Sequence, residues 1–228
     1  MKSGEEAVSW HPVWEEIFRS RPWGQYPPEE LIRFVARVFY GVPDRAAVRI
    51  LELGCGPGAN MWYMAREGFS VYGVDGSPTA VALAGERLRQ ESLTADLRVG
   101  DIVELGDLYT GLQFSAIIDV VCLQCNRLCD VQRIVEQALD LLKPSGKFFA
   151  MMIAHGSVGC GTGVRIEEGT FDNITEGPFA GTGLNHFFTL KEIELLFRSF
   201  SDLNIEYTER SLRNRTAAYK FWLAEATK

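Results

Sequence analysis

Apolar residues along the chain alternate between short continuous runs and longer stretches with helical spacing. Runs of strand length lie at 48–53, 69–74, 96–99, 114–121 and 147–153. Between them, the spacing predicts helices over 60–67, from Pro78 through Leu88 with Ser77 as N-cap, and from an N-cap at Asp130 through Leu142. Strands that alternate with helices pair in parallel through right-handed crossovers. The pattern therefore predicts an α/β fold, a doubly wound Rossmann-like sheet that is mostly parallel and carries helices on both faces.

The two ends of the chain depart from this rhythm. Pro28 begins a predicted helix that continues through Val38, after a stretch rich in tryptophan. We expect residues 1–44 to form an N-terminal helical segment that covers a site on the main domain, residues 45–228, within one globular unit. Near the C-terminus, Thr189 and Glu192 form a capping box. Strand-like runs at 203–207 and 219–224 have no helix between them, which predicts an antiparallel strand.

The composition limits the partners of the protein. A formal net charge of −7 argues against non-specific nucleic-acid binding, which requires a surplus of Lys and Arg. No apolar run approaches the roughly 20 residues that span a bilayer, and residues 1–6 have no signal-peptide pattern, so we expect a cytoplasmic protein without a membrane partner. The cysteine cluster at 122–129 has no nearby histidine to complete a tetrahedral site, so we predict no metal.

A glycine-rich turn follows the first predicted strand. Glycines at 54, 56 and 58 let the backbone turn sharply and approach a ligand closely. Asp75 ends the second strand about twenty residues later, where a carboxylate can accept both hydroxyls of a ribose. Asp101 follows the third strand and is placed to receive an adenine amino group. These positions predict a nucleoside site at the carboxyl ends of the strands.

Five separated motifs resemble those of the class I S-adenosylmethionine-dependent methyltransferases, especially the small bacterial ones that act on small molecules. The motifs are residues 51–58, 73–77, 100–102, 114–119 and 141–147. The resemblance covers residues 45–155 closely, and the order of elements beyond them loosely. Ser145 departs from the second glycine that is common in the family. The resemblance implies S-adenosyl-L-methionine as cofactor and S-adenosyl-L-homocysteine as product.

The resemblance also implies roles for individual residues. Glu52 and the glycines would line the methionine and ribose part of the cofactor, Asp75 would hold the ribose, and Asp119 would contact the amino-acid part. Trp23 lies in a segment, Arg21 to Gly24, that is similar to the entry segment of several small-molecule methyltransferases. The predicted cofactor-binding residues are Glu52, Gly54, Cys55, Gly56, Gly58, Asn60, Asp75, Gly76, Ser77, Asp101, Ile102, Asp119, Val120 and Trp23.

Of four other functions, the sequence disfavours two and leaves two open. A nicotinamide dehydrogenase would carry G-x-G-x-x-G, whereas the spacing here is G-x-G-x-G. A nucleic-acid methyltransferase is disfavoured by the charge and by the residues 119–122, which lack an Asn-Pro-Pro-aromatic motif. A methyltransferase acting on sulfur or a metalloid stays open. So does a catalytically silent scaffold that keeps the fold.

Fewer sequence signals bear on the acceptor and on a catalytic base than on the cofactor site. Methyl transfer depends on positioning, and an acceptor hydroxyl must also lose its proton, whereas an amine needs little help. We expect a small-molecule acceptor, methylated at oxygen or nitrogen. His155 and His186 are the candidate bases, and each has a purely structural role as an alternative. The glycine-rich segment between them is interpreted as an acceptor-binding segment or lid. The oligomeric state cannot be inferred.

Overall fold

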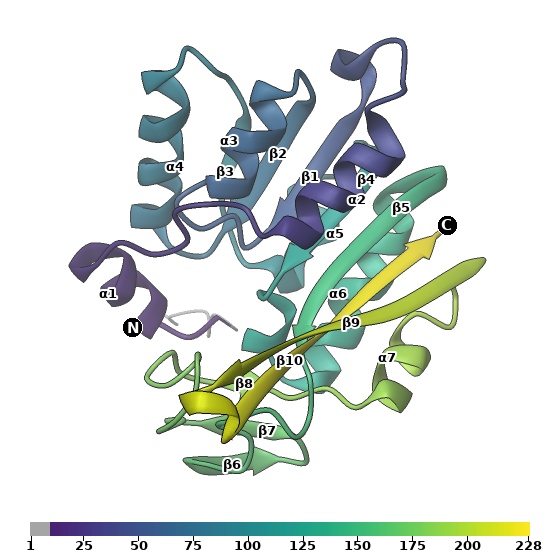
Figure 1. The fold of residues 1–228 in the computed structure, drawn as a ribbon. Helices are drawn as coiled ribbons and strands as arrows, with labels where there is room; N and C mark the ends of the chain where they lie inside the picture. Colours follow the sequence, from purple (N-terminus) through teal and green to yellow (C-terminus); the bar gives the residue numbers. More distant parts are fainter. Residues whose placement is uncertain (1–9) are drawn as a thin grey trace, which may run out of the picture.

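Seven strands form one sheet in the order β3-β2-β1-β4-β5-β10-β9 in the computed structural model, which describes residues 10–228 (Figure 1). The predictions that concern residues 1–9 therefore lie outside the described residues. Strands β1 to β5 are parallel, and β10 pairs antiparallel with both β5 and β9. The strands are β1 (Arg49–Leu53), β2 (Ser70–Asp75), β3 (Asp96–Val99), β4 (Phe114–Val120), β5 (Leu142–Ile153), β9 (Asp202–Leu212) and β10 (Ala217–Thr227).

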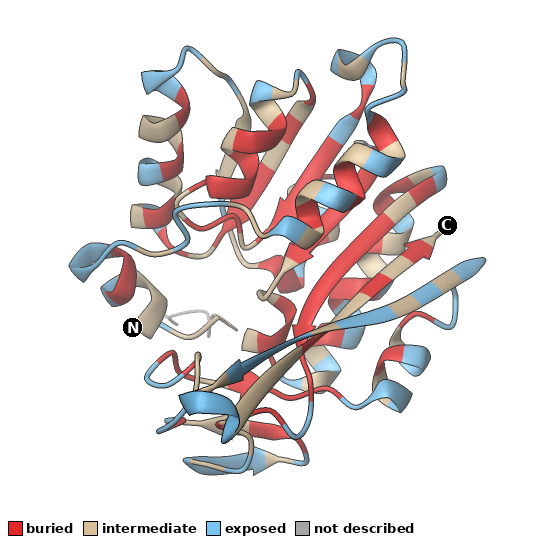
Figure 2. Cartoon of the chain, viewed as in Figure 1, coloured by how far each residue is buried: buried red, intermediate tan, exposed pale blue. Residues whose placement is uncertain are grey.

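Helices cover both faces of this sheet, which confirms the predicted fold class. One apolar core lies between the sheet and α2 (Glu29–Phe39) and α3 (Ala59–Arg66), and α4 (Pro78–Gln90) packs beside α3. The other core lies against α5 (Leu105–Leu108), α6 (Leu128–Leu141) and α7 (Leu190–Leu196). Figure 2 shows the strands β1, β4 and β5 buried between these layers. Short 3-10 turns are η1 (Arg45–Ala47), η2 (Ile102–Glu104), η3 (Leu123–Cys125) and η4 (Arg213–Arg215).

Local signals explain most of the boundaries. The Ser77 side chain accepts a hydrogen bond from Ala80 N (3.1 Å), so the predicted N-cap of α4 is confirmed. The predicted Thr189 and Glu192 capping box is present at α7. The prediction that Asp130 caps α6 was wrong, because the helix begins at Leu128 and Asp130 lies in its first turn. The fifth predicted strand begins earlier than residue 147, because Leu142 already pairs with Phe114 of β4. The pairing then resumes at Lys147 after a register shift.

The glycine-rich segment between β5 and α7 has its own structure. It contains a three-stranded antiparallel sheet of β6 (Val164–Glu167), β7 (Thr170–Asp172) and β8 (Asn185–His186). A buried amide connects it to the main domain, since the Gln124 side chain donates to Asn185 Oδ1 (3.0 Å) and accepts from Ile153 N (2.9 Å). The segment is thus a packed subdomain, in which the buried side chains of Thr170, Thr182 and Asn185 make hydrogen bonds.

The first helix stands apart from the second. Helix α2 buries Leu31, Phe34 and Val35 in the core of the main domain. Helix α1 (Val13–Ser20) instead lies beyond the carboxyl ends of the strands, between α4 and the small β6–β8 sheet (Figure 1). Among residues 10–228, no helix has the length and apolar character needed to cross a membrane.

Candidate functional site

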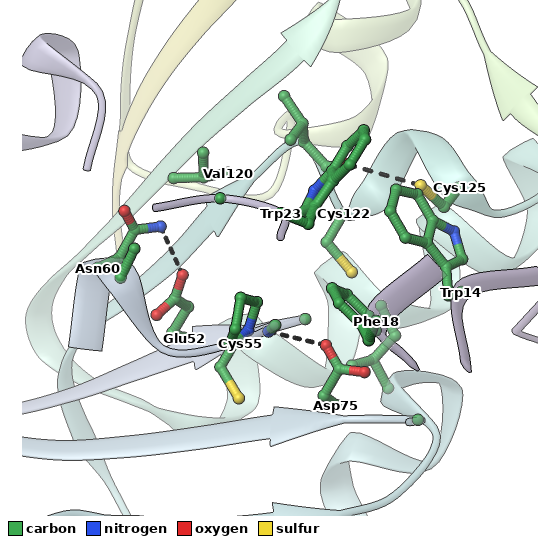
Figure 3. Close-up of a pocket in the computed structure, with 18 of the residues that line it drawn as sticks. Trp14, Phe18, Trp23, Glu52, Cys55, Asn60, Asp75, Val120, Cys122 and Cys125 are labelled. Atoms are coloured by element: carbon green, nitrogen blue, oxygen red, sulfur yellow. Dashed lines mark hydrogen bonds between the residues drawn. The ribbon is translucent and has the colours of Figure 1, made fainter. Parts of the chain in front are cut away.

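A cavity opens at the carboxyl ends of β1, β2 and β4, beneath α1. Doubly wound sheets bind small molecules in a crevice at this edge. Its floor comes from the turns after the three strands, and its roof comes from the N-terminal segment (Figure 3). The roof residues are Trp10, His11, Trp14, Phe18, Trp23, Gly24, Tyr26 and Pro28.

Asp75 is fixed at the end of β2 with both oxygens aimed at backbone amides. Oδ2 accepts from Gly56 N (2.8 Å) and Oδ1 accepts from Ser77 N (2.8 Å). A carboxylate offers about four lone-pair sites, so each oxygen keeps capacity for one more donor. The side chain is buried yet lines the cavity, and this burial raises its pKa. The residue is therefore a rigid, two-oxygen acceptor.

Glu52 lies at the end of β1, almost fully buried. Its Oε1 accepts from Asn60 Nδ2 (2.6 Å), while Oε2 is buried without a hydrogen-bond partner (Figure 3). Burial, reinforced by the nearby carboxylates of Asp75 and Asp119, raises the pKa of Glu52 to about 8. A buried polar atom without a partner is costly in a native structure. Because Glu52 lines the cavity, a ligand donor or cation is the natural partner for this side chain.

The turn after β1 requires glycine for two reasons. Gly54 has a φ of 60°, a conformation that side chains with a Cβ disfavour. A Cβ at this position would also lie 2.6 Å from the Cβ of Cys122 and overlap its sulfur. Gly58 has a φ of 80°, and a Cβ there would approach the Ala84 Cβ to 2.8 Å. Gly54 lines the cavity, whereas Gly58 serves the packing of α3 against α4.

The structure gathers most of the predicted cofactor-binding residues around one cavity. Ten of the fourteen line it, and their roles stay predictions. The four that do not line it are Gly58, Ser77, Asp101 and Asp119. Ser77 caps α4 and holds Asp75, and Asp101 accepts from Val103 N (3.0 Å) at η2. The ten lining residues are Glu52, Gly54, Cys55, Gly56, Asn60, Asp75, Gly76, Ile102, Val120 and Trp23.

Asp119 organises the floor from below. Its Oδ1 accepts from Cys122 N (3.0 Å) and Leu123 N (2.8 Å), which fixes the turn that follows β4. Its Oδ2 is buried without a hydrogen-bond partner, and burial raises the pKa of the group to about 7. This carboxyl therefore shapes the turn that brings Val120 and Cys122 to the cavity.

Neither candidate base lines the cavity. His155 follows β5 and is exposed. His186 is fully buried in β8, where Thr170 Oγ1 lies 2.7 Å from its Nδ1 and Glu192 Oε1 lies 3.6 Å from its Nε2. Burial lowers the pKa of His186. These contacts support the structural role that was kept as the alternative for His186.

The histidine that does line the cavity is His11. Its Nδ1 accepts from Val13 N (3.2 Å), and its Nε2 lies 3.9 Å from Asp172 Oδ1. The sequence places it near the tryptophans, but nothing in the chain indicates that it meets Asp172. The other lining residues that the sequence did not single out for the site include Phe18, Asn126 and the thiols of Cys122 and Cys125.

The lining carries carboxylates, aromatic rings and thiols. None of its described residues is Lys or Arg. Burial raises the pKa of the Cys55, Cys122 and Cys125 thiols, so they remain protonated at neutral pH. Among residues 10–228, no group of three or more His, Cys, Asp or Glu side chains is arranged to hold a metal ion. The walls thus suit a ligand that is cationic or neutral.

These features fit S-adenosylmethionine. The two free sites on Asp75 match a ribose diol, and the unpartnered Oε2 of Glu52 matches a hydroxyl or ammonium donor. The absence of cationic side chains from the described lining matches a ligand that carries positive charge.

Binding of this cation should release protons near neutral pH. Glu52, with a pKa of about 8, and Asp119, with a pKa of about 7, hold protons in the free protein at pH 6.5. A bound cation favours their ionised forms, so affinity should rise as pH increases from 6 to 8, by up to about tenfold per unit for each group. Titration calorimetry in buffers of different ionisation enthalpy measures the release.

The Glu52→Gln variant is the control for this effect, because its amide oxygen can still accept from Asn60 while the group no longer titrates. Proton release should fall in this variant. Equal release by the variant and the parent protein would rule out Glu52 as the source.

The sequence matches known proteins over its central part. Residues 50–146 match a family model described as a methyltransferase domain. A ubiquinone biosynthesis O-methyltransferase from Chelativorans sp. (strain BNC1) is 30% identical over 147 residues, 61% of this chain and 56% of the relative. A demethylmenaquinone methyltransferase from Tropheryma whipplei is 30% identical over 111 residues, 48% of this chain and 44% of the relative. The chain thus spans about half the length of these curated relatives.

Solved structures share the fold. TehB from Haemophilus influenzae superposes with a TM-score of 0.65 at 18% identity, covering 94% of this chain and 67% of that one. A methyltransferase from Methanosarcina mazei gives a TM-score of 0.62 at 22% identity, covering 83% and 94%. The match over residues 50–146 is to a methyltransferase domain, and these solved structures agree with the predicted fold.

Proposed function

We propose that the protein transfers a methyl group from S-adenosylmethionine to oxygen or nitrogen of a small, uncharged acceptor with an aromatic or similarly flat apolar body. The observation that carries this proposal is one cavity with two kinds of wall. Its floor presents the carboxylates of Glu52 and Asp75, and its roof presents tryptophan and phenylalanine rings (Figure 3). Bound S-adenosylmethionine supplies an electrophilic methyl group on a sulfonium.

The floor is assigned to the cofactor. We assign the ribose hydroxyls to Asp75 and a polar group of the methionine part to Glu52, which Asn60 holds in place. Ile102 lines the cavity next to Asp101, at the turn we assign to adenine. The residues predicted at 1–44 divide between two tasks in this proposal. Residues 10–28 cover the site, and α2 belongs to the core.

The roof is assigned to the acceptor. Trp14 and Trp23 meet edge to face at 5.3 Å between ring centroids, and Trp14 stacks on Phe18 at 5.7 Å. Such rings favour flat apolar ligands and provide large contact areas. The described lining offers no Lys or Arg to neutralise a phosphate or carboxylate, which disfavours anionic acceptors. The relatives named for quinone biosynthesis agree with an acceptor of this kind.

Proton removal places a further restriction on the acceptor. The Nδ1 lone pair of His11 is occupied by Val13 N–H, so Nε2 carries the ring proton in the neutral form. This histidine therefore has no free lone pair for a base. Catalysis then depends on positioning, which favours an acceptor that loses its proton easily, such as a phenolic hydroxyl, or an amine.

Titration calorimetry with S-adenosylmethionine, S-adenosylhomocysteine and NAD is the first test. We expect the first two to bind and NAD not to bind. Methyl transfer is then measured with a set of simple phenols and aromatic amines, each paired with its phosphorylated or carboxylated analogue. The neutral member of each pair should be the better acceptor by kcat/KM.

Two outcomes would redirect the proposal. Preferential methylation of thiols would favour the sulfur-directed alternative. Cofactor binding without transfer to any acceptor class would favour the catalytically silent scaffold. The cytoplasmic location predicted from the sequence remains part of this proposal.

A further inference from the structure

One carboxylate fastens the roof helix to the floor of the cavity. Glu15 lies on α1, and its Oε1 accepts from Thr79 Oγ1 (2.6 Å). Its Oε2 accepts from Thr79 N (3.3 Å) and from the Ser77 hydroxyl. The side chain is only 18% exposed and also pairs with Arg19 at 2.9 Å. These bonds lower the pKa of Glu15, so the group is ionised at neutral pH.

The residue that receives Glu15 also holds the ribose carboxylate. Ser77 donates its backbone N–H to Asp75 Oδ1, caps α4 through its hydroxyl oxygen, and donates that hydroxyl to Glu15. Asp75 in turn accepts from Gly56 N. A continuous hydrogen-bonded path therefore runs from the glycine turn through Asp75 and Ser77 to the roof helix.

The roof touches the floor on both sides of Asp75. A Cβ at Gly76 would lie 2.6 Å from the Trp10 indole, and a Cβ at Gly56 would lie 3.7 Å from the Phe18 ring. On the other side of the cavity, Trp14 and Cys125 both line the wall (Figure 3). Asp75 is only 8% exposed beneath these rings. A nucleoside bound at Asp75 would therefore lie beneath these rings.

We infer that Glu15 is a positioning residue that holds the aromatic roof closed over the bound cofactor, so that the cofactor binds before the acceptor and leaves only when α1 is released. This inference rests on the proposed function. The roof supplies the acceptor walls, so the acceptor pocket is complete only after Glu15 meets Ser77 and Thr79. Glu15 itself does not line the cavity and contacts no reacting group.

The dissociation rate of S-adenosylhomocysteine tests this role. Three of the five tryptophans, Trp10, Trp14 and Trp23, line the cavity, so stopped-flow tryptophan fluorescence can follow release. Hydrogen bonds to a charged group are each worth enough that Glu15→Ala should speed release by about tenfold to a hundredfold. Glu15→Gln keeps an accepting oxygen, so its release rate should lie between those of the parent protein and Glu15→Ala. The acceptor KM should rise with the release rate.

Two further variants separate positioning from a general effect on α1. Glu16→Ala removes the neighbouring, exposed carboxylate and should change release by less than about twofold. Thr79 lies outside the cavity lining, so Thr79→Val should reproduce part of the faster release seen with Glu15→Ala. Because the two residues share one contact, the double variant should release the ligand little faster than Glu15→Ala alone.

The outcomes distinguish this inference from the proposed function. If the parent protein fails to bind S-adenosylhomocysteine, the proposed function fails. If it binds, and Glu15→Ala releases the ligand at the parent rate, the role of Glu15 is overturned while the function stands. Equal acceleration by Glu16→Ala would also overturn it, because α1 would then act only as a packing element.

Discussion

Replacing Asp75 with alanine should lower the affinity for S-adenosylhomocysteine by at least about a hundredfold. In the proposed complex each carboxylate oxygen accepts one ribose hydroxyl. Hydrogen bonds to charged groups contribute about 1.5–3 kcal/mol each. Losing two of them costs more than the roughly 2.7 kcal/mol that a hundredfold change in affinity requires. Asp75 also fixes Gly56 and Ser77 through their backbone N–H groups, so the loss extends to the shape of the floor.

Calorimetry at fixed pH measures this change, and far-UV circular dichroism verifies that the variant is folded. Asp107→Asn is the matched control, because Asp107 is an exposed carboxylate in α5 that does not line the cavity. The control should bind as the parent does. A folded Asp75→Ala protein with unchanged affinity would show that the ribose is not held at this position.

The sequence predicted the sheet well because its signals are local. Short apolar runs, the Ser77-Pro78 cap and the capping box at Thr189 each act within a few residues. The single antiparallel strand could also be foreseen, since no helix pattern separates the last two apolar runs. Asp130 shows the limit of such signals. It is a good capping residue by type, yet the helix begins two residues earlier, at Leu128.

The floor of the site was predicted for the same reason. Glu52, Gly54 and Asp75 occupy strand ends, and parallel strands bring their carboxyl ends to one edge of a sheet. Asp119 was predicted at its strand end, but its side chain is taken up by the following turn, at Cys122 and Leu123. Sequence position thus locates a side chain at the site without saying which way it points.

The roof depends on contacts that no local pattern encodes. His11 meets Asp172 and Glu15 meets Ser77 and Thr79 across large separations in the chain. The tryptophans near the N-terminus form a visible cluster in the sequence, but packing of a terminal helix on the domain would explain them equally well. The glycine-rich segment between β5 and α7 is the reverse case. The sequence predicts an acceptor-binding segment or lid there, yet the segment supplies none of the described lining residues.

Replacing Gly54 with alanine should destabilise the protein by about 2–5 kcal/mol. Gly54 has a φ of 60°, and a left-handed conformation costs a residue with a Cβ roughly 1–2 kcal/mol. The new methyl group would also overlap the Cys122 side chain. Overpacking of this kind adds about 1–3 kcal/mol. Urea unfolding followed by circular dichroism measures the free energy of unfolding.

Gly111→Ala separates the two contributions to this loss. Gly111 has a φ of 78°, and no atom lies within 4 Å of where its Cβ would be, so this variant reports the backbone cost alone. The Gly54→Ala loss should exceed it. Adding Cys122→Gly to Gly54→Ala removes the overlapping atoms and should restore part of that excess, but none of the backbone cost. Equal losses in the free energy of unfolding for Gly54→Ala and Gly111→Ala would contradict this prediction. They would show that only the backbone conformation requires glycine at position 54 and that Cys122 moves aside.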